Sequence, residues 1–250
     1  MNKKTMILFV QILIILIFLL LWEFLTAKKI INPFIFSSPS KVYATLKELF
    51  ISNEIYKHLS TTIYEVILSF SLGISLGFLC AIILYEFPTL ARIIEPFLTM
   101  LNSLPKVALG PMIIILIGAN TKAIITMALL INLILSIQNI YNGFLGTDKN
   151  KIKLMKSLKA NKYQILTILV IKESLRTIIS SLKINISMTL IGVIMGEFLV
   201  SKQGIGYLII YGSQIFNLDL VITGIFILVI LSIILYKMIT YIEQKTLKKF

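Results

Sequence analysis

The sequence predicts an all-α protein, a polytopic bundle of about six transmembrane helices. Of its 250 residues, 58% are hydrophobic and only 14% are charged, and the mean hydropathy is +0.95. Soluble domains are about 45–50% apolar and about 25% charged. The apolar residues also fall in long uninterrupted runs, and one span needs about 20 of them. We therefore expect an integral membrane protein.

Six apolar segments are long enough to be spans. They lie at about 6–26, 62–85, 94–118, 122–145, 178–200 and 217–241. Pro105 and Pro111 interrupt the third, which a spanning helix tolerates where neighbouring helices satisfy the freed backbone groups. The first is too long for a typical signal-peptide core, and no clear small-residue cleavage site follows it. We expect it to be retained as a span.

The spans divide the chain into regions. These are a first transmembrane helix, 1–26; an outer loop with an amphipathic helix, 27–61; a core membrane domain, 62–241, with a cytoplasmic loop, 146–177; and a basic cytoplasmic tail, 242–250. Positive charge is retained on the cytoplasmic side of a membrane. The lysine-rich loop and tail both follow this rule if the N-terminus is inside. The outer loop, with five lysines, is the exception.

The outer loop contains a predicted helix in the stretch SSPSKVYATLKELF. Ser40 can cap a helix that begins at about residue 41. Val42, Leu46 and Leu49 then recur at helical spacing and give it one apolar face. We expect this helix to lie on the membrane or against the bundle.

The segment 148–183 carries nine Lys or Arg residues and is the most basic part of the chain. Ile152, Met155 and Leu158 share one helical face, a turn is expected at 159–162, and a second helix follows from about 163. Two interpretations stay open. The segment is either a helical hairpin that inserts into a groove on a cytoplasmic partner, or a solvated basic linker against lipid headgroups.

The formal net charge of +13 does not indicate a nucleic-acid partner, because the lysines flank apolar spans and form no soluble basic face. Anionic lipid headgroups are the expected counter-charge. Among charged residues within spans, Glu65 is expected near the outer end of the second, from where its side chain can reach water. Glu197 is expected near the outer end of the fifth, and Lys106 between the two prolines. Hydrogen bonding between helices is the favoured role of the polar residues there. The neutral ones are Asn102, Asn132, Gln138, Asn139 and Asn185.

Small residues recur every four positions in two spans. They are Ser69, Gly73 and Gly77 in the second, and Gly192 and Gly196 in the fifth. This pattern lets helix backbones approach closely. Packing within the chain is favoured over a dedicated dimer seam.

Catalytic and metal-binding motifs are missing from the sequence. There is no H-E-x-x-H motif, nucleophile elbow or P-loop, so no catalytic residue, metal or cofactor is predicted. The single histidine, His58, is expected at the surface. The single cysteine, Cys80, excludes an intrachain disulfide. Gly204-Ile205-Gly206 is expected to be a tight outer turn.

Short motifs in a consistent order point to a known family. They are Ser38-Pro39-Ser40; Pro105-x-x-Ala108-x-x-Pro111; Leu158-x-Ala160-x-x-x-Gln164-Ile165; and Glu197 followed by Gly204-Ile205-Gly206-Tyr207-Leu208-Ile209 and Asp219. In these the chain resembles the permease subunits of bacterial ABC importers, of the nitrate/sulfonate/taurine type. The resemblance covers nearly the whole chain after the first span.

The resemblance implies a type I importer fold in a bacterial-type plasma membrane. It implies a homodimer or paired permease, cytoplasmic ATPase subunits that hydrolyse ATP, and an extracellular solute-binding protein. This chain would then be no enzyme. The residues implied to contact the ATPase are Lys156, Ser157, Leu158, Lys159, Ala160, Asn161 and Tyr163. The residues offered for the translocation pathway are Asn185, Met188 and Thr189.

The chain departs from the family pattern at several positions. In the cytoplasmic signature E-A-A-x-x-x-G, followed by nine residues and I-x-L-P, lysines stand at the glutamate, glycine and proline positions: Lys153, Lys159 and Lys172. Glu65 stands where the branch usually has arginine. A lysine-rich loop of this kind suits a more acidic ATPase groove.

The substrate is not fixed by the sequence. The resemblance implies a sulfonate-, taurine- or nitrate-like anion, or a vitamin precursor. Two alternatives remain at this stage. An ion-coupled secondary transporter should show an inverted repeat with paired broken helices, and only the third span is interrupted. A scaffold of a vitamin-type uptake system should carry Ala-Arg-Gly-like motifs, which are missing from the sequence.

Overall fold

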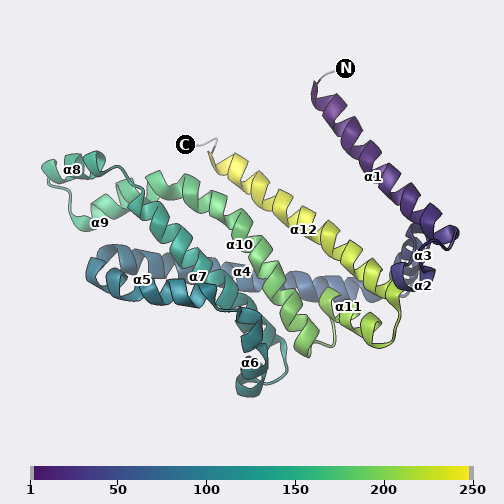
Figure 1. The fold of residues 1–250 in the computed structure, drawn as a ribbon. Helices are drawn as coiled ribbons and strands as arrows, with labels where there is room; N and C mark the ends of the chain where they lie inside the picture. Colours follow the sequence, from purple (N-terminus) through teal and green to yellow (C-terminus); the bar gives the residue numbers. More distant parts are fainter. Residues whose placement is uncertain (1–2, 248–250) are drawn as a thin grey trace.

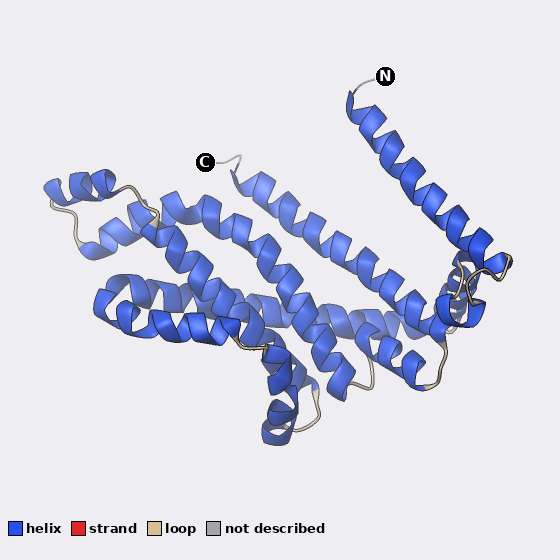
Figure 2. Cartoon of the chain, in the orientation of Figure 1, coloured by secondary structure: helices blue, strands red, loops and turns tan. Residues whose placement is uncertain are grey.

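A computed structural model describes residues 3–247, and every regular element in that range is a helix (Figure 2). The elements are α1 (Lys3–Ala27), α2 (Pro33–Phe36), α3 (Pro39–Ile51), α4 (Glu54–Glu86), α5 (Pro88–Ser103), the 3-10 helix η1 (Lys106–Leu109), α6 (Gly110–Ile117), α7 (Thr121–Leu145), α8 (Lys149–Ser157), α9 (Lys162–Gln164), the π-helix η2 (Ile165–Val170), α10 (Ile171–Val200), α11 (Ile205–Gln214) and α12 (Leu218–Leu247). The all-α prediction is confirmed. The last three residues of the predicted tail, 248–250, lie outside the described range.

Within residues 3–247, five helical segments are long and apolar enough to cross a membrane. They contain α1, α4, α7, α10 and α12. A sixth candidate is a bent pair: α5 and the segment Lys106–Ile117 are long and apolar enough only together, and they meet at 87°, as in a broken span or a re-entrant loop. The break follows from Pro105, since Leu104 before it is extended, with ψ 139°. The prediction of about six spans, with an interrupted third, is confirmed.

Helix α7 is packed between α4 and α10, and small residues permit this close approach (Figure 1). A Cβ at Gly77 of α4 would lie 2.5 Å from Ser136 Cβ of α7. A Cβ at Gly192 of α10 would lie 2.7 Å from the Ala128 Cα. The small-residue pattern therefore packs helices within the chain, as predicted.

Replacing Gly192 by valine is expected to destabilise the bundle, because the atom in its way belongs to the backbone of α7 and no side-chain rotation relieves the clash. Overpacking of this kind costs about 1–3 kcal/mol. Thermal unfolding in detergent, followed with a thiol-reactive dye at Cys80, measures the loss. The matched control is Gly146→Val, since a Cβ there would have no neighbour closer than 3.4 Å. Equal melting temperatures for the two variants would contradict the packing argument.

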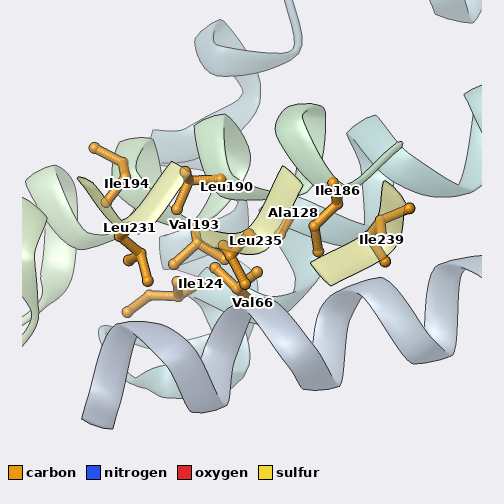
Figure 3. Packing of buried hydrophobic residues seen from close by; sticks show 10 residues of the cluster. All are labelled: Val66, Ile124, Ala128, Ile186, Leu190, Val193, Ile194, Leu231, Leu235 and Ile239. Carbon is orange, nitrogen blue, oxygen red and sulfur yellow. The ribbon is translucent and has the colours of Figure 1, made fainter. Parts of the chain in front are cut away.

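The main core lies where four helices meet (Figure 3). Its buried residues are Val66 of α4, Ile124 and Ala128 of α7, Ile186, Leu190, Val193 and Ile194 of α10, and Leu231, Leu235 and Ile239 of α12. A second cluster, which includes Phe144 and Ile165, fixes the α8–α9 hairpin to the ends of α4 and α7. The core thus joins the membrane helices to the basic segment. Helix α1 stands largely apart, exposed along most of its length (Figure 1).

The outer segment differs in detail from the prediction. Helix α3 begins at Pro39, and its N-cap is Ser38 in place of Ser40, with the Lys41 amide donating to Ser38 Oγ at 3.3 Å. Proline suits the first turn of a helix, where its missing N–H costs nothing. Ser40 instead donates through its amide and hydroxyl to the Glu23 carboxylate, at 2.9 and 2.8 Å. Helix α3 contacts α12, α4 and α1, so it lies against the bundle.

Candidate functional site

The basic segment forms a capped hairpin. Helix α8 starts where the Asn150 amide donates to Asp148 Oδ1 at 2.8 Å. The turn after it depends on Lys159, whose φ of 60° ends the helix. Helix α9 then starts with a capping box, in which Asn161 and Gln164 each donate a backbone N–H to the other's side chain at 2.8 Å. These caps hold the turn in one shape.

The hairpin has a buried and an exposed apolar side. Ile152 and Met155 pack against the cluster below, whereas Leu154, Leu158 and Tyr163 are 60–71% exposed. The prediction that Leu158 shares a face with Ile152 and Met155 is wrong, because α8 ends at Ser157 and Leu158 lies in the turn. Ala160 is half-buried, and the other residues predicted to contact an ATPase are exposed. These are Lys156, Ser157, Leu158, Lys159, Asn161 and Tyr163.

Five hairpin lysines have no acidic partner among the residues that the structure describes. Lys151 is paired with Glu173 at 2.8 Å, and this hydrogen bond raises the pKa of Lys151 above its usual range. Across residues 3–247, none of the other hairpin lysines has a carboxylate within 4 Å. These are Lys149, Lys153, Lys156, Lys159 and Lys162. The exposed apolar tip is thus surrounded by uncompensated positive charge.

The residues predicted for the pathway lie inside the helix packing. Asn185 and Thr189 are fully buried, and Met188 is half-buried. Asn185 Nδ2 donates to Ser136 Oγ at 3.2 Å, and Thr189 Oγ1 donates to the Asn185 carbonyl at 2.7 Å. The expectation that Asn185 hydrogen-bonds between helices is confirmed. A pathway role for these three residues stays a prediction.

Glu197 connects three elements at the opposite end of α10 from the hairpin. It is fully buried and accepts hydrogen bonds from Thr62 Oγ1 of α4 at 2.6 Å and from the Gly206 amide of α11 at 2.5 Å. Thr62 Oγ1 also accepts from the Ile205 amide at 2.8 Å. We call Glu197, Thr62 and the segment Gly204–Gly206 the outer carboxylate cluster.

The tight turn expected at Gly204-Ile205-Gly206 is confirmed only for Gly204, because Ile205 and Gly206 begin helix α11. The conformation at Gly204 requires glycine. Gly204 has φ 112°, and a Cβ there would clash with the Glu197 carboxylate. The Gly204 amide donates to His58 Nδ1 at 3.0 Å. The prediction of a surface His58 is wrong: the residue is 6% exposed and its ring stacks on Tyr207.

Glu65 is also misplaced by the prediction. It was expected to reach water, but it is fully buried beside Glu197. Among the described residues, neither of its carboxylate oxygens has a hydrogen-bond partner. Only Glu197 therefore organises the cluster. The sequence pattern that pointed to this cluster was Glu197 with Gly204 seven residues later. Nothing in the sequence linked Glu197 to Thr62 or His58.

The described chain is thus a multi-pass bundle of membrane-length helices with an exposed basic hairpin at one end of α10 and a hydrogen-bonded turn at the other. Residues 73–248 match the family described as "Binding-protein-dependent transport system inner membrane component". Since the match covers more than half of the chain, the chain belongs to this family. It is thus the permease component of an ABC transporter, an inner-membrane protein that works with ATPase and binding-protein partners and does not itself carry out catalysis.

Named relatives are distant but extend over most of the chain. The formylaminopyrimidine transport permease protein ThiX of Halalkalibacterium halodurans is 25% identical over 93% of this chain and 92% of its own. The taurine transport system permease protein TauC of Escherichia coli K12 is 20% identical over 88% of this chain and 82% of its own. These values support the family and the nitrate/sulfonate/taurine-type branch.

A solved structure supports the fold. An inward-facing conformation of the MetNI methionine ABC transporter matches with a TM-score of 0.66 and 18% identity, over 74% of this chain and 92% of that one. The type I permease architecture is therefore confirmed. The alternatives of a secondary transporter and a vitamin-type scaffold are set aside.

Proposed function

We propose that this permease imports a small solute, either a sulfonate-, taurine- or nitrate-like anion or a vitamin precursor. Two copies form the pathway between them. A solute-binding protein delivers the solute from outside, and two ATPase subunits each hold one α8–α9 hairpin in a groove. The two relatives named above, which by their descriptions transport formylaminopyrimidine and taurine, support both substrate classes.

The observation that carries this proposal is one continuous helical segment, Lys162–Val200, of 39 residues. At its start the capping box fixes the hairpin turn, and near its end Glu197 holds the outer turn. A displacement of the hairpin by an ATPase is therefore passed along a helix to the outer carboxylate cluster. The π-helix η2 directly follows α9 of the hairpin, and such irregular turns often occur at functional positions.

The coupling residues in this proposal are those of the hairpin turn. Leu158 and Tyr163 supply exposed apolar contact, and Lys156 and Lys159 supply positive charge. Because the hairpin lysines other than Lys151 lack acidic partners in the described chain, the matching ATPase groove is expected to be acidic.

A triple charge reversal of Lys153, Lys156 and Lys159 to glutamate tests the acidic groove. We expect ATPase capture to fall by about tenfold or more at low salt, and the remaining binding to depend less on salt than that of the wild type. Co-purification at several salt concentrations measures both effects. The control reverses Lys28, Lys47 and Lys57, which are exposed in the outer segment. Unchanged capture by the hairpin variant would contradict the proposal.

A further inference from the structure

Helix α5 carries a line of exposed polar residues. They recur every three or four positions, so they share one face of the helix. Its members, which we call the α5 polar stripe, are Arg92, Glu95, Thr99, Asn102, Ser103 and, just past the helix end, Lys106. The first five are exposed and Lys106 is half-buried. Only Ala91 and Leu98 of this helix are buried. The stripe belongs to the broken third span.

The stripe borders two hollows. An open groove of about 660 Å³ runs along Arg92, Glu95, Thr99 and Ser103, and Pro96, Met100 and Leu104 complete its lining. A smaller, more enclosed cleft of about 240 Å³ lies between α4, α5 and α7, where Glu95 and Thr99 face Gln138, Tyr141 and Asn142. The polar side chains of α5 and α7 therefore face common open space.

Lipid does not suit this face of α5. Charged side chains are costly in hydrocarbon and, within membrane proteins, face a bundle interior or a water-filled cavity. The other side of α5 presents Ile93, Phe97 and Leu101, which are exposed and apolar, as lipid contact requires. One side of α5 therefore suits a watery or protein environment, and the other side suits lipid.

The charge on the stripe is mainly positive. Lys106 Nζ donates to the Asn102 carbonyl and to Asn102 Oδ1, both at 3.1 Å. Within residues 3–247, neither Lys106 nor Arg92 has a carboxylate within 4 Å. With two cations, Arg92 and Lys106, and one carboxylate, Glu95, the stripe carries a net positive charge. Such a charge raises the local concentration of anions.

We propose that the α5 polar stripe is the wetted wall of the solute pathway, and that Lys106, at the 87° break, selects the charge of what passes. The inference rests on the proposed function and adds the residues that line and filter the route. Thr99, Asn102 and Ser103 offer uncharged hydrogen-bonding groups between the cations of Arg92 and Lys106. The ligand class that fits is a small anion with several acceptor oxygens.

Cysteine accessibility in reconstituted nanodiscs tests the wall. In a Cys80→Ser background, Thr99→Cys and Ser103→Cys are each treated with two thiol reagents of similar size: an anionic ethylsulfonate and a cationic ethyltrimethylammonium methanethiosulfonate. Phe97→Cys, on the apolar side of α5, is the matched control. Ser60→Cys, exposed in the outer part of α4, gives the reference ratio of the two rates in open water.

We expect both stripe cysteines to react and Phe97→Cys to stay unmodified. At Ser103→Cys the anionic-to-cationic rate ratio should exceed the Ser60→Cys ratio by about threefold or more. Adding Lys106→Gln should lower the ratio toward the reference, and Lys106→Arg should keep it. Since the measurement uses the permease chain alone, its outcome is separate from ATPase capture.

Two results would overturn the inference. Stripe cysteines as unreactive as Phe97→Cys would mean that a dry protein contact covers the stripe. If the stripe cysteines react but Lys106→Gln leaves their anionic-to-cationic rate ratio unchanged, Lys106 does not select the charge of the solute. Disulfide formation between copies at Thr99→Cys, with loss of reagent access, belongs to the first result.

Discussion

Replacing Glu197 by alanine is expected to disrupt the outer end of the bundle and to cost several kcal/mol of stability. The change leaves two buried donors, the Thr62 hydroxyl and the Gly206 amide, without their acceptor. Each unsatisfied buried group costs about 1–3 kcal/mol. A cavity forms in addition, because Glu197 is among the largest fully buried side chains. Thermal unfolding with a thiol-reactive dye at Cys80 measures the effect.

Glu65→Gln is the matched control for Glu197→Ala. Both glutamates are fully buried and adjacent, but in the described chain Glu65 accepts no hydrogen bond. Glutamine has the shape of glutamate and its amide can donate to the adjacent Glu197 carboxylate, so the change leaves no buried donor without an acceptor. We expect the melting temperature of this variant to equal or exceed that of the wild type. A larger loss in Glu65→Gln than in Glu197→Ala would refute the account of the outer carboxylate cluster.

Replacing both Leu158 and Tyr163 by aspartate is expected to abolish ATPase capture while leaving the permease folded. The two side chains are 70% and 71% exposed, so little packing within the chain is lost. At an interface, a central aromatic or apolar anchor is commonly worth about 2 kcal/mol or more. Two such losses, with new negative charge facing an acidic groove, should lower affinity by about 100-fold or more. Titration of the ATPase subunit onto immobilised permease measures it.

The control for the hairpin tip is Phe216→Asp. Phe216 is 73% exposed in the turn between α11 and α12, and its φ of 57° is one that aspartate tolerates. The Phe216→Asp variant should bind the ATPase with the same affinity as the wild type. Loss of binding in both variants would point to general destabilisation and against a specific contact at the hairpin.

The membrane spans were predictable because hydropathy and proline positions are local properties of the sequence. The bend at Leu104 and Pro105 and the small residues facing α7 follow directly from residue type. The cap at Ser38 was missed by two residues because the proline after it suits the helix as well as the linker.

The outer carboxylate cluster was not predictable in full. Thr62 and Glu197 are 135 residues apart, and His58 and Gly204 are 146 apart, so only the tertiary fold brings them together. Sequence reasoning gave both His58 and Glu65 access to water, although the packing of α4 against α10 and α11 buries them. The α5 polar stripe was missed because Arg92 precedes the predicted start of the third span at about 94, and the stripe is recognised only with the helix in place.

Native co-purification is the direct test of the proposed coupling between the hairpin of this chain and separate ATPase subunits. The intact chain and the Leu158→Asp, Tyr163→Asp variant are isolated from membranes in several mild detergents, and the bound proteins are identified. The account predicts an ATPase subunit with the intact chain, in equal number to the permease, and none with the folded variant. A folded intact chain that brings down no ATPase in any detergent, or a variant that binds it equally well, would show that the hairpin does not couple this permease to an ATPase.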